Sequence, residues 1–353
     1  MIPVQNIYYM LSYAFKILHK QEYKRIATEE FKNAADLLAE IMIISLSIQV
    51  KRGLGREYRS QTESLSALKG KINISESLTP PNWRRKQLVC QYDDFSLDSR
   101  MNRIIKASIE ILLKADISRD RKKKLRKLLV FFGEVSKINL HSINWNLQYN
   151  RNNQSYQLLM SICYLVVNGL IHTEREGNKK LMNFLDERRE SLLYEKFILG
   201  YYKKHYPQIQ VTASQIPWAL DDGFGEMLPI MQSDIYLKYK DTILIIDAKY
   251  YSSNTQIRFD KRTLHSNNLY QIFTYVKNQA YRLSDSNDTV AGMLLYAKTD
   301  IDIQPNQVYQ MHGNQISVKN LDLNLQFASI AEQLDDIITS HFVSPPKRYQ
   351  LEL

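Results

Sequence analysis

The chain has 353 residues, of which 44% are hydrophobic, a composition that fits a globular protein large enough for two domains. Its formal net charge of +10 suits a polyanionic partner, although a charge of this size does not by itself identify one. No Gly-x4-Gly-Lys-Ser/Thr sequence occurs, so we expect the chain to bind no nucleotide cofactor by itself.

The composition also argues against secreted, membrane and zinc proteins. Cys90 and Cys163 lie far apart in apolar surroundings and are typical of reduced thiols, and the seven histidines form no zinc-binding pattern. The N-terminus lacks the features of a signal peptide, and the longest apolar stretch, residues 158–171, is too short to span a bilayer. We therefore expect a cytoplasmic protein that does not associate with a membrane.

The first half of the chain mixes helical patterns with a glycine-containing segment. Residues 51–74 carry glycines between short polar stretches, which predicts hairpins or an extended loop rather than packed core. Pro80 and Pro81 indicate a stiff turn. We expect helices over residues 4–20, 29–50, 98–115 and 154–170, and a strand over residues 87–93.

A basic run stands out in this half. Residues 118–127, SRDRKKKLRK, place seven basic residues in ten positions. Two interpretations stay open: the charged face of a solvated helix, or a patch that contacts phosphate or a partner.

The second half predicts an α/β domain. The polar loop at residues 177–180 indicates a domain boundary near residue 180, which gives domains at 1–180 and 181–353. The β-branched run at residues 243–246 is typical of a buried strand. In order, we expect a helix over 187–205, strands over 209–217, around Asp234 and over 243–249, a helix over 268–282 and a strand over 290–296.

The most informative motif joins Asp234 to Asp247-Ala248-Lys249. Residues i and i+2 of a strand point to the same face, so Asp247 and Lys249 project together, and Asp234 on the paired strand can add a second carboxylate. Two such oxygens can hold Mg²⁺, with the carbonyl of Ala248 as a further ligand, and Lys249 can position a water. This is the core of the PD-(D/E)xK nuclease motif. The alternative is an ordinary strand end that meets solvent.

Two further features add to this motif. Gln271 and Tyr275 are four residues apart on the following helix and therefore share a face, which resembles the accessory motif of RecB-like nucleases. Glu195, on the helix that opens the domain, is the candidate for another carboxylate at the metal. A solvated glutamate paired with a lysine explains Glu195 equally well.

Short strings along nearly the whole chain carry a more specific resemblance: IPV and NIYYML (residues 2–4 and 6–11), RGL (52–54), LKGKI (68–72), NRIIK (102–106), SLLYEKF (191–197), DAKYY (247–251) and HSNNLYQ (265–271). In these strings the chain resembles the McrC family, the nuclease subunits of McrBC modified-cytosine restriction systems. Ser233-Asp234 departs from a literal Pro-Asp, but the carboxylate that would bind metal is present.

The resemblance implies a division of labour between the two domains. A mixed sheet flanked by helices, the PD-(D/E)xK domain, cuts double-stranded DNA that contains modified cytosine, with Mg²⁺ as cofactor. A domain of helices and a β-hairpin enters a hexameric ring of McrB, an AAA+ GTPase, and stimulates its GTP hydrolysis. Within residues 51–72, Arg52, Arg56 and Lys69 are our candidates for contacts with that ring.

These inferences favour an α+β or α/β protein that is the DNA-cleaving subunit of a methylcytosine-dependent restriction complex. Two alternatives stay open. One is a catalytically inactive regulatory or scaffold subunit of the same complex, and the other is a stand-alone RecB-like repair nuclease.

Overall fold

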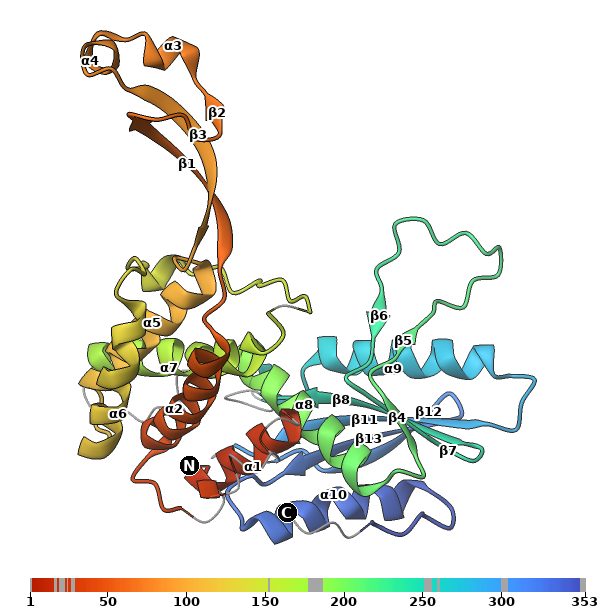
Figure 1. The fold of residues 1–353 in the computed structure, drawn as a ribbon. Coiled ribbons are helices and arrows are strands. Elements are labelled where there is room, and N and C mark those ends of the chain that lie inside the picture. Colours follow the sequence, from red (N-terminus) through yellow and green to blue (C-terminus); the bar gives the residue numbers. More distant parts are fainter. Residues whose placement is uncertain are drawn as a thin grey trace. The chain divides into compact units, whose positions relative to one another are not determined.

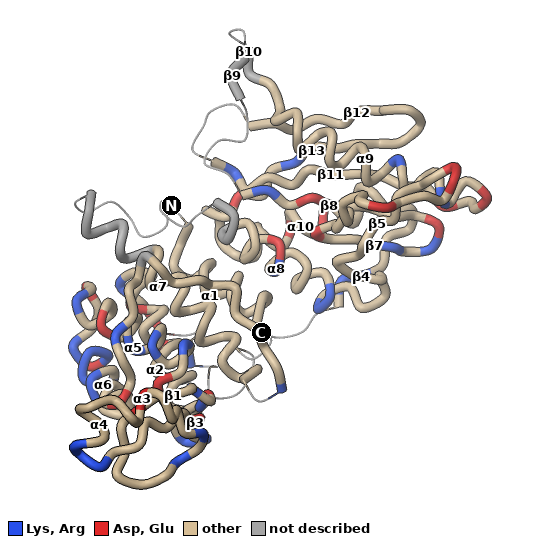
Figure 2. Tube along the Cα trace, turned by 90° about the horizontal axis from the view of Figure 1, so that it is seen from above, with Lys and Arg blue, Asp and Glu red and all other residues tan. Residues whose placement is uncertain are grey.

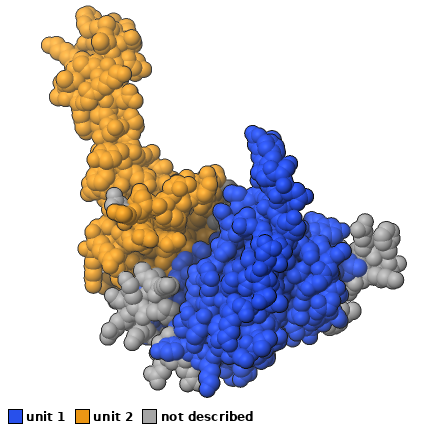
Figure 3. Space-filling view, turned by 90° about the vertical axis from the view of Figure 1, so that its right-hand side faces the viewer, with its two compact units in different colours: residues 1–29, 184–353 blue, residues 30–183 orange. Residues whose placement is uncertain are grey.

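The computed structural model divides the chain into two compact units, coloured in Figure 3: unit 1 comprises Met1–Glu29 and Phe184–Leu353, and unit 2 comprises Glu30–Asn183. The expected boundary near residue 180 lies outside the described residues. Residues 1–29, expected in the N-terminal domain, cluster with the C-terminal part of the chain instead. The structure describes residues 2–15, 18, 23, 25–26, 29–151, 153–176, 187–250, 256–258, 261–299 and 304–349.

Helix α1 (Val4–Ala14) explains why the first residues belong to unit 1. The buried Asn6 amide donates to the carbonyls of Leu323 and Leu325 at 2.8 and 2.7 Å, and the Tyr13 hydroxyl lies 2.7 Å from His205 Nε2. Buried polar groups need such partners, so these bonds fix α1 in place. In sequence, unit 2 is therefore an insertion between α1 and the rest of unit 1.

Unit 1 is built on a six-stranded mixed sheet in the order β12-β13-β11-β8-β7-β4. Strand β11 runs parallel to β8 and β13, and the other neighbours are antiparallel. The strands are β4 (Gln210–Thr212), β7 (Ile235–Tyr239), β8 (Thr242–Lys249), β11 (Thr289–Ala297), β12 (Gln307–Met311) and β13 (Asn314–Leu321), with small ribbons β5 (Gln215–Ile216) with β6 (Met231–Gln232) and β9 (Gln256–Arg258) with β10 (Lys261–Thr263).

Helices cover both faces of this sheet, with α9 (Ser266–Arg282) and α10 (Phe327–His341) on opposite sides (Figure 1). Ile243 and Ile245 of β8 pack with Ile272 and Val276 of α9. The intervening Leu244 and Ile246 are also fully buried, as expected for a central strand covered on both faces. Helix α8 (Glu187–His205) packs on α10, because Tyr201 and Tyr202 donate to its backbone carbonyls.

The order of elements expected for the second half is confirmed: helix, strand, strand after Asp234, strand ending in Asp-Ala-Lys, helix, strand. The strand expected over 209–217 is split into β4 and β5. Asp234 stands one residue before β7 rather than within it. No helix in the described ranges combines the length and apolarity needed to cross a membrane.

Unit 2 combines a group of helices with a projecting hairpin, which we call the finger (residues 57–96; Figure 1). Its sheet has the order β1-β3-β2, and two short helices cap its far end, the tip (residues 73–87). The glycine-containing segment therefore does form a hairpin, as expected. The elements are α2 (Ala34–Arg52), β1 (Glu57–Leu65), β2 (Lys71–Ile72), α3 (Ile74–Ser77), α4 (Pro80–Arg84), β3 (Leu88–Ser96), α5 (Arg100–Lys114), α6 (Arg119–Leu129), η3 (Val130–Phe132), η4 (Leu140–Ser142) and α7 (Tyr156–Glu176).

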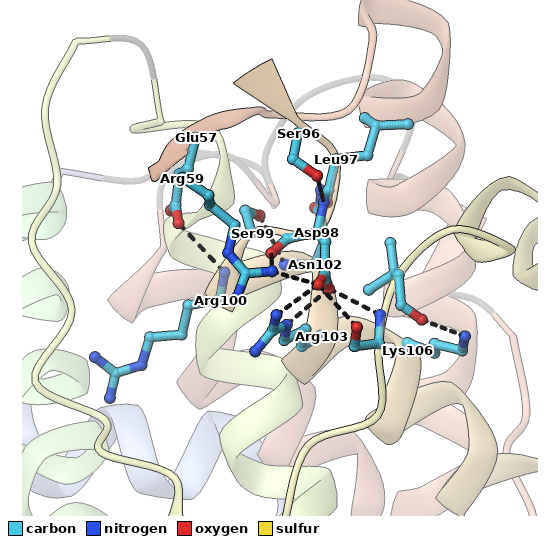
Figure 4. Close-up of polar contacts among 12 residues, drawn as sticks. Glu57, Arg59, Ser96, Leu97, Asp98, Ser99, Arg100, Asn102, Arg103 and Lys106 are labelled. Atoms are coloured by element: carbon cyan, nitrogen blue, oxygen red, sulfur yellow. Dashed lines mark hydrogen bonds and ion pairs between the residues drawn. The ribbon is translucent and has the colours of Figure 1, made fainter. Parts of the chain in front are cut away.

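The foot of the finger is fixed by Asp98 (Figure 4). Its carboxylate accepts Arg59 of β1 and Arg103 of α5, each at 2.5 Å, and also the backbone and hydroxyl of Ser136 at 2.8 Å. Hydrogen bonding from Arg103 holds the pKa of Asp98 well below its usual range. Asn102 adds bonds to the carbonyls of Gly55 and Leu97, both at 2.8 Å. The finger is therefore tied to α5 by charge-assisted bonds at its foot.

Gly292 of β11 sets the closest approach of α9 to the sheet. An added Cβ would lie 2.7 Å from Val276 Cγ2 and 2.9 Å from Ile272 Cγ1. We predict that Gly292→Ala lowers the free energy of unfolding by about 1–3 kcal/mol, because the helix must move away. Chemical denaturation against Gly133→Ala, whose nearest atom lies at 3.6 Å, checks this. Equal stability of the two variants would contradict the packing described.

Candidate active site

The carboxylate of Asp247 is the centre of the candidate site. It lies near the end of β8 and is 0% exposed. Lys249, two residues further along, forms an ion pair with it, with Nζ 2.9 Å from Oδ2. Apart from this ion pair, neither carboxylate oxygen has a hydrogen-bond partner of ordinary geometry within the described residues. A buried charge with so few partners is costly to keep and is typical of a site that binds something.

Asp234 faces the same point from the neighbouring strand. Its Oδ2 accepts a hydrogen bond of 2.8 Å from the backbone nitrogen of Ala248, between Asp247 and Lys249. Burial, and then the charges of Asp247 and Glu195, raise the pKa of Asp234 to about 8. The hairpin of β7 and β8 therefore brings the two aspartates together, as the spacing predicted.

Lys249 links these acids to α9. Its Nζ donates to Gln271 Oε1 at 3.2 Å, and Gln271 Nε2 donates in turn to the hydroxyl of Tyr275 at 2.9 Å. Gln271 and Tyr275 thus share a face of α9, and that face lies beside the acidic cluster. The sequence predicted that Gln271 and Tyr275 share a face, and Gln271 also contacts Lys249.

Glu195 of α8 lies near the same cluster. Burial raises the pKa of its carboxyl, the charge of Asp247 adds to the rise, and Ser191 and Lys249 oppose it. Burial likewise raises the pKa of Asp247 against the opposing effect of Lys249. The pKa values of all three carboxyl groups are raised, so the nearby positive charge and hydrogen bonds do not fully stabilise their charged forms.

This arrangement fits a hard divalent cation held in part by water. Within the described ranges, no group of three or more His, Cys, Asp or Glu side chains is gathered closely enough to hold a metal ion. Mg²⁺ commonly uses one or two carboxylates and keeps several waters, so a closed cage is not required. The unsatisfied oxygens of buried Asp247 and the raised pKa of Asp234 are what a nearby cation would relieve.

A further pair near the site was not foreseen from sequence. Asn268 of α9 is 6% exposed, and its amide donates to the fully buried hydroxyl of Tyr296 at 3.0 Å. Tyr296 lies opposite Lys249 in the parallel register of β11 and β8. This bond holds the first turn of α9, which carries Gln271 one turn later. The position of Asn268 in the HSNNLYQ string was the feature of the sequence that could have indicated this pair.

The candidate partner-binding residues lie in unit 2 and are not brought together. Arg52 ends α2, and the Arg56 guanidinium lies 5.9 Å from the ring centre of Phe95 at the foot of the finger. Lys69 Nζ lies 3.6 Å from the ring centre of Tyr92, which is paired with Gln61 midway along β1. Tyr92 and Phe95 are three residues apart on β3, about 10 Å, so Lys69 lies midway along the finger and the two arginines at its foot.

Comparison with known proteins identifies the family. A family model described as McrBC 5-methylcytosine restriction system component matches residues 4–297, which include α1, unit 2 and every candidate site residue. This chain belongs to the McrBC family. The type IV methyl-directed restriction enzyme EcoKMcrBC of Escherichia coli K12 is 28% identical over 347 residues, which cover 96% of this chain and 98% of that protein.

Two solved structures are also similar. A half-complex of Thermococcus gammatolerans McrB AAA+ hexamers with bound McrC is 17% identical, with a TM-score of 0.48 over 95% of this chain and 76% of that one. A second structure, of the Thermococcus gammatolerans McrBC complex, is 19% identical, with a TM-score of 0.39 over 49% of this chain and 57% of that one.

The shared charge in this McrBC-family site predicts a pH dependence of stability. The ordinary pKa of aspartate is 3.8, and that of Asp234 is about 8, so the folded state holds a proton that the unfolded chain releases. Without metal, the free energy of unfolding therefore falls as pH rises from about 4 to about 8. Asp234→Asn should remove much of this fall in thermal unfolding with EDTA between pH 6 and 9. If the wild type and the variant lost stability in parallel over that range, Asp234 would not be the group whose proton stabilises the folded state.

Proposed function

We propose that this chain is the DNA-cleaving subunit of a methylcytosine-dependent restriction complex, and that it hydrolyses phosphodiester bonds with Mg²⁺. The observation that carries the proposal is the buried Asp247 carboxylate, which meets Asp234, Glu195 and Lys249 at the end of β8. Membership of the McrBC family supports the substrate class.

In this mechanism Asp234 and Asp247 would hold the ion, the carbonyl of Ala248 would add a ligand, and Glu195 would complete the set. Bound Mg²⁺ supplies a Lewis acid for a phosphate oxygen and lowers the pKa of a coordinated water. Lys249, fixed between Asp247 and Gln271, holds the attacking water in line or neutralises charge on the phosphate.

Gln271 and Tyr275 have a separate task in this mechanism. Their mutual hydrogen bond and the contact of Gln271 with Lys249 support a position for both side chains beside the reacting phosphate. From there they would hold the DNA backbone on either side of the bond that is cut. Holding the substrate in this way makes the reaction of the bound phosphate effectively unimolecular, which lowers the entropic part of the barrier.

We also propose that the finger contacts an McrB-type AAA+ GTPase hexamer and stimulates its GTP hydrolysis. The matching family model describes a component of the McrBC restriction system. Membership of this family supports a second component of that system as the partner. The tip exposes three apolar side chains, Ile74 at 67%, Leu78 at 68% and Trp83 at 68%. An exposed tryptophan beside basic residues is the composition expected of an anchor in a protein interface.

The basic residues of the tip follow Trp83 directly: Arg84, Arg85 and Lys86, all exposed. Lys69 lies midway along the finger, whereas Arg52 and Arg56 are candidates for contacts at its foot. The Asp98 network at the foot holds the finger against α5, so the tip is presented on a stalk rather than on a free loop.

The first test of hydrolysis is Lys249→Ala. We predict loss of plasmid cleavage by at least about a hundredfold, because the group that positions water or neutralises charge is gone. Cleavage of methylated plasmid would be measured with Mg²⁺, with the partner and GTP. Asp247→Ala should behave likewise, while Lys203→Ala, an exposed lysine two turns along α8 from Glu195, should cut normally.

The outcomes of this test separate the proposal from its alternatives. Full cleavage by Lys249→Ala would show that the residues around Asp247 are not the site of DNA hydrolysis. Cleavage by the wild-type chain without partner would favour a stand-alone repair nuclease. Faster GTP hydrolysis by the partner without any cleavage would leave a regulatory subunit.

The tip makes a second, independent prediction. We expect Trp83→Ala combined with Arg84→Ala and Arg85→Ala to weaken binding to the GTPase ring by about tenfold or more, because exposed anchors are lost without disturbing the core. Stimulated GTP hydrolysis and ring affinity would be measured together. Tyr281→Ala, 62% exposed near the end of α9 in unit 1, is the control outside the finger. Ring binding unchanged in the triple variant would remove the tip from the interface.

A further inference from the structure

Helix α6 of unit 2 presents four exposed basic residues along one side. Among its eleven residues only Arg121 and Leu125 are buried. Figure 2 shows the tube of α6 largely in the colour of lysine and arginine. The exposed bases Arg119, Lys123, Arg126 and Lys127 are spaced by four, three and one residues, which places them along one side of a helix.

The opposite side of α6 is anchored unusually firmly. The buried Arg121 guanidinium bonds to Asp36 Oδ2 at 2.7 Å and to Glu40 Oε2 at 2.9 Å, both on α2. It also lies 4.8 Å from the ring centre of Phe31. Ser118 caps the helix by accepting from the backbone nitrogen of Arg121. These contacts prevent the helix from rotating, so the row of bases is held at a fixed place on unit 2.

This row is electrostatically unfavourable in the isolated chain. Arg119 lies four residues before Lys123, and Lys123 lies four residues before Lys127, so like charges are neighbours on the helix surface. Within α6, the ion pair between Asp120 and Lys124, at 2.5 Å, is the compensating contact that the described residues provide. These like charges destabilise the helix that carries them. A ligand of opposite charge that binds the row would offset this repulsion.

The dimensions of the row suit duplex DNA. Residues 119–127 rise about 12 Å along the helix axis, at about 1.5 Å per residue. A DNA duplex carries one negative charge per about 1.7 Å of its axis, so about seven phosphate charges lie within that length. Lysine is depleted at protein–protein interfaces, and the exposed apolar residues Val130 and Phe131 lie only beyond the end of the row. The composition therefore favours nucleic acid over protein.

We propose that the exposed face of α6, comprising Arg119, Lys123, Arg126 and Lys127, binds the phosphate backbone of double-stranded DNA without reading its sequence. This is a binding site in unit 2, distinct from the candidate active site in unit 1. Its affinity does not depend on the hydrolysis proposed above, because backbone contacts need neither Mg²⁺ nor a cleavable bond.

The test uses the full chain with Lys123→Glu and Lys127→Glu together. The glutamate at position 123 lies four residues after Arg119 and three before Arg126, and the glutamate at 127 lies three after Lys124, so three repulsive pairs become attractive. The pair 123 and 127 stays a like-charge pair, as in the wild type. The variant should therefore unfold at the same temperature as the wild type or higher. Loss of DNA affinity in such a variant cannot be blamed on misfolding.

Binding would be measured by fluorescence anisotropy with a 30-base-pair duplex in EDTA, over 50–200 mM salt. We expect the α6 variant to bind about tenfold or more weakly at the lowest salt, and the slope of log K against log salt to fall by about 1.8, since each lost phosphate contact removes about 0.9. Lys203→Glu with Lys347→Glu, exposed positions in unit 1, is the control with the same charge change.

The control variant should lose less than about threefold. Equal losses in the two variants would mean that net charge alone acts, and the proposal would be overturned. It would also be overturned if the wild type did not bind the duplex, or if the α6 variant bound DNA normally and lost affinity for the GTPase ring instead. Duplex binding is measured in EDTA, and plasmid cleavage by the wild type is measured separately with Mg²⁺, partner and GTP, so a failure of the proposed cleavage would be seen apart from a failure of binding.

Discussion

The fold of unit 1 depends on one electrostatic constraint: a carboxylate, Asp247, stands fully buried at the end of the central strand. Burial raises the pKa of Asp247, and the charge of Asp247 in turn adds to the raised pKa values of Asp234 and Glu195. Lys249 alone does not balance three acids. The sheet, α8 and α9 must therefore hold these groups in place against their repulsion, which explains why rigid elements carry them.

The packing of α9 shows how this is achieved. Gly292 leaves room for Ile272 and Val276 to approach β11 closely, so the helix is seated by apolar contact. Polar residues then occupy the side of α9 nearest the end of the sheet, where Asn268 bonds to Tyr296 and Gln271 meets Lys249. Apolar packing fixes the distance of α9 from the sheet, and the polar bonds fix the rotation of α9 about its own axis.

Sequence reasoning succeeded where chemistry is carried by local spacing. The pair Asp247 and Lys249 shares a face because of the strand period, and Gln271 with Tyr275 because of the helix period, so both could be predicted. The parallel neighbour β11 brings in Tyr296 from far along the chain, which no spacing reveals. The placement of α1 in unit 1 was missed for the same reason, since it depends on bonds between Asn6 and carbonyls more than 300 residues away.

The two charged features of the chain follow the same physical logic with opposite sign. In unit 1, acids are crowded around Asp247 with one lysine among them. In unit 2, bases are crowded along α6, and the two acids beside this helix, Asp36 and Glu40, are already paired with the buried Arg121. Each arrangement would be relieved by an ion of the opposite sign, the proposed metal cation in unit 1 and the proposed phosphate contact in unit 2. DNA with its accompanying Mg²⁺ would supply both.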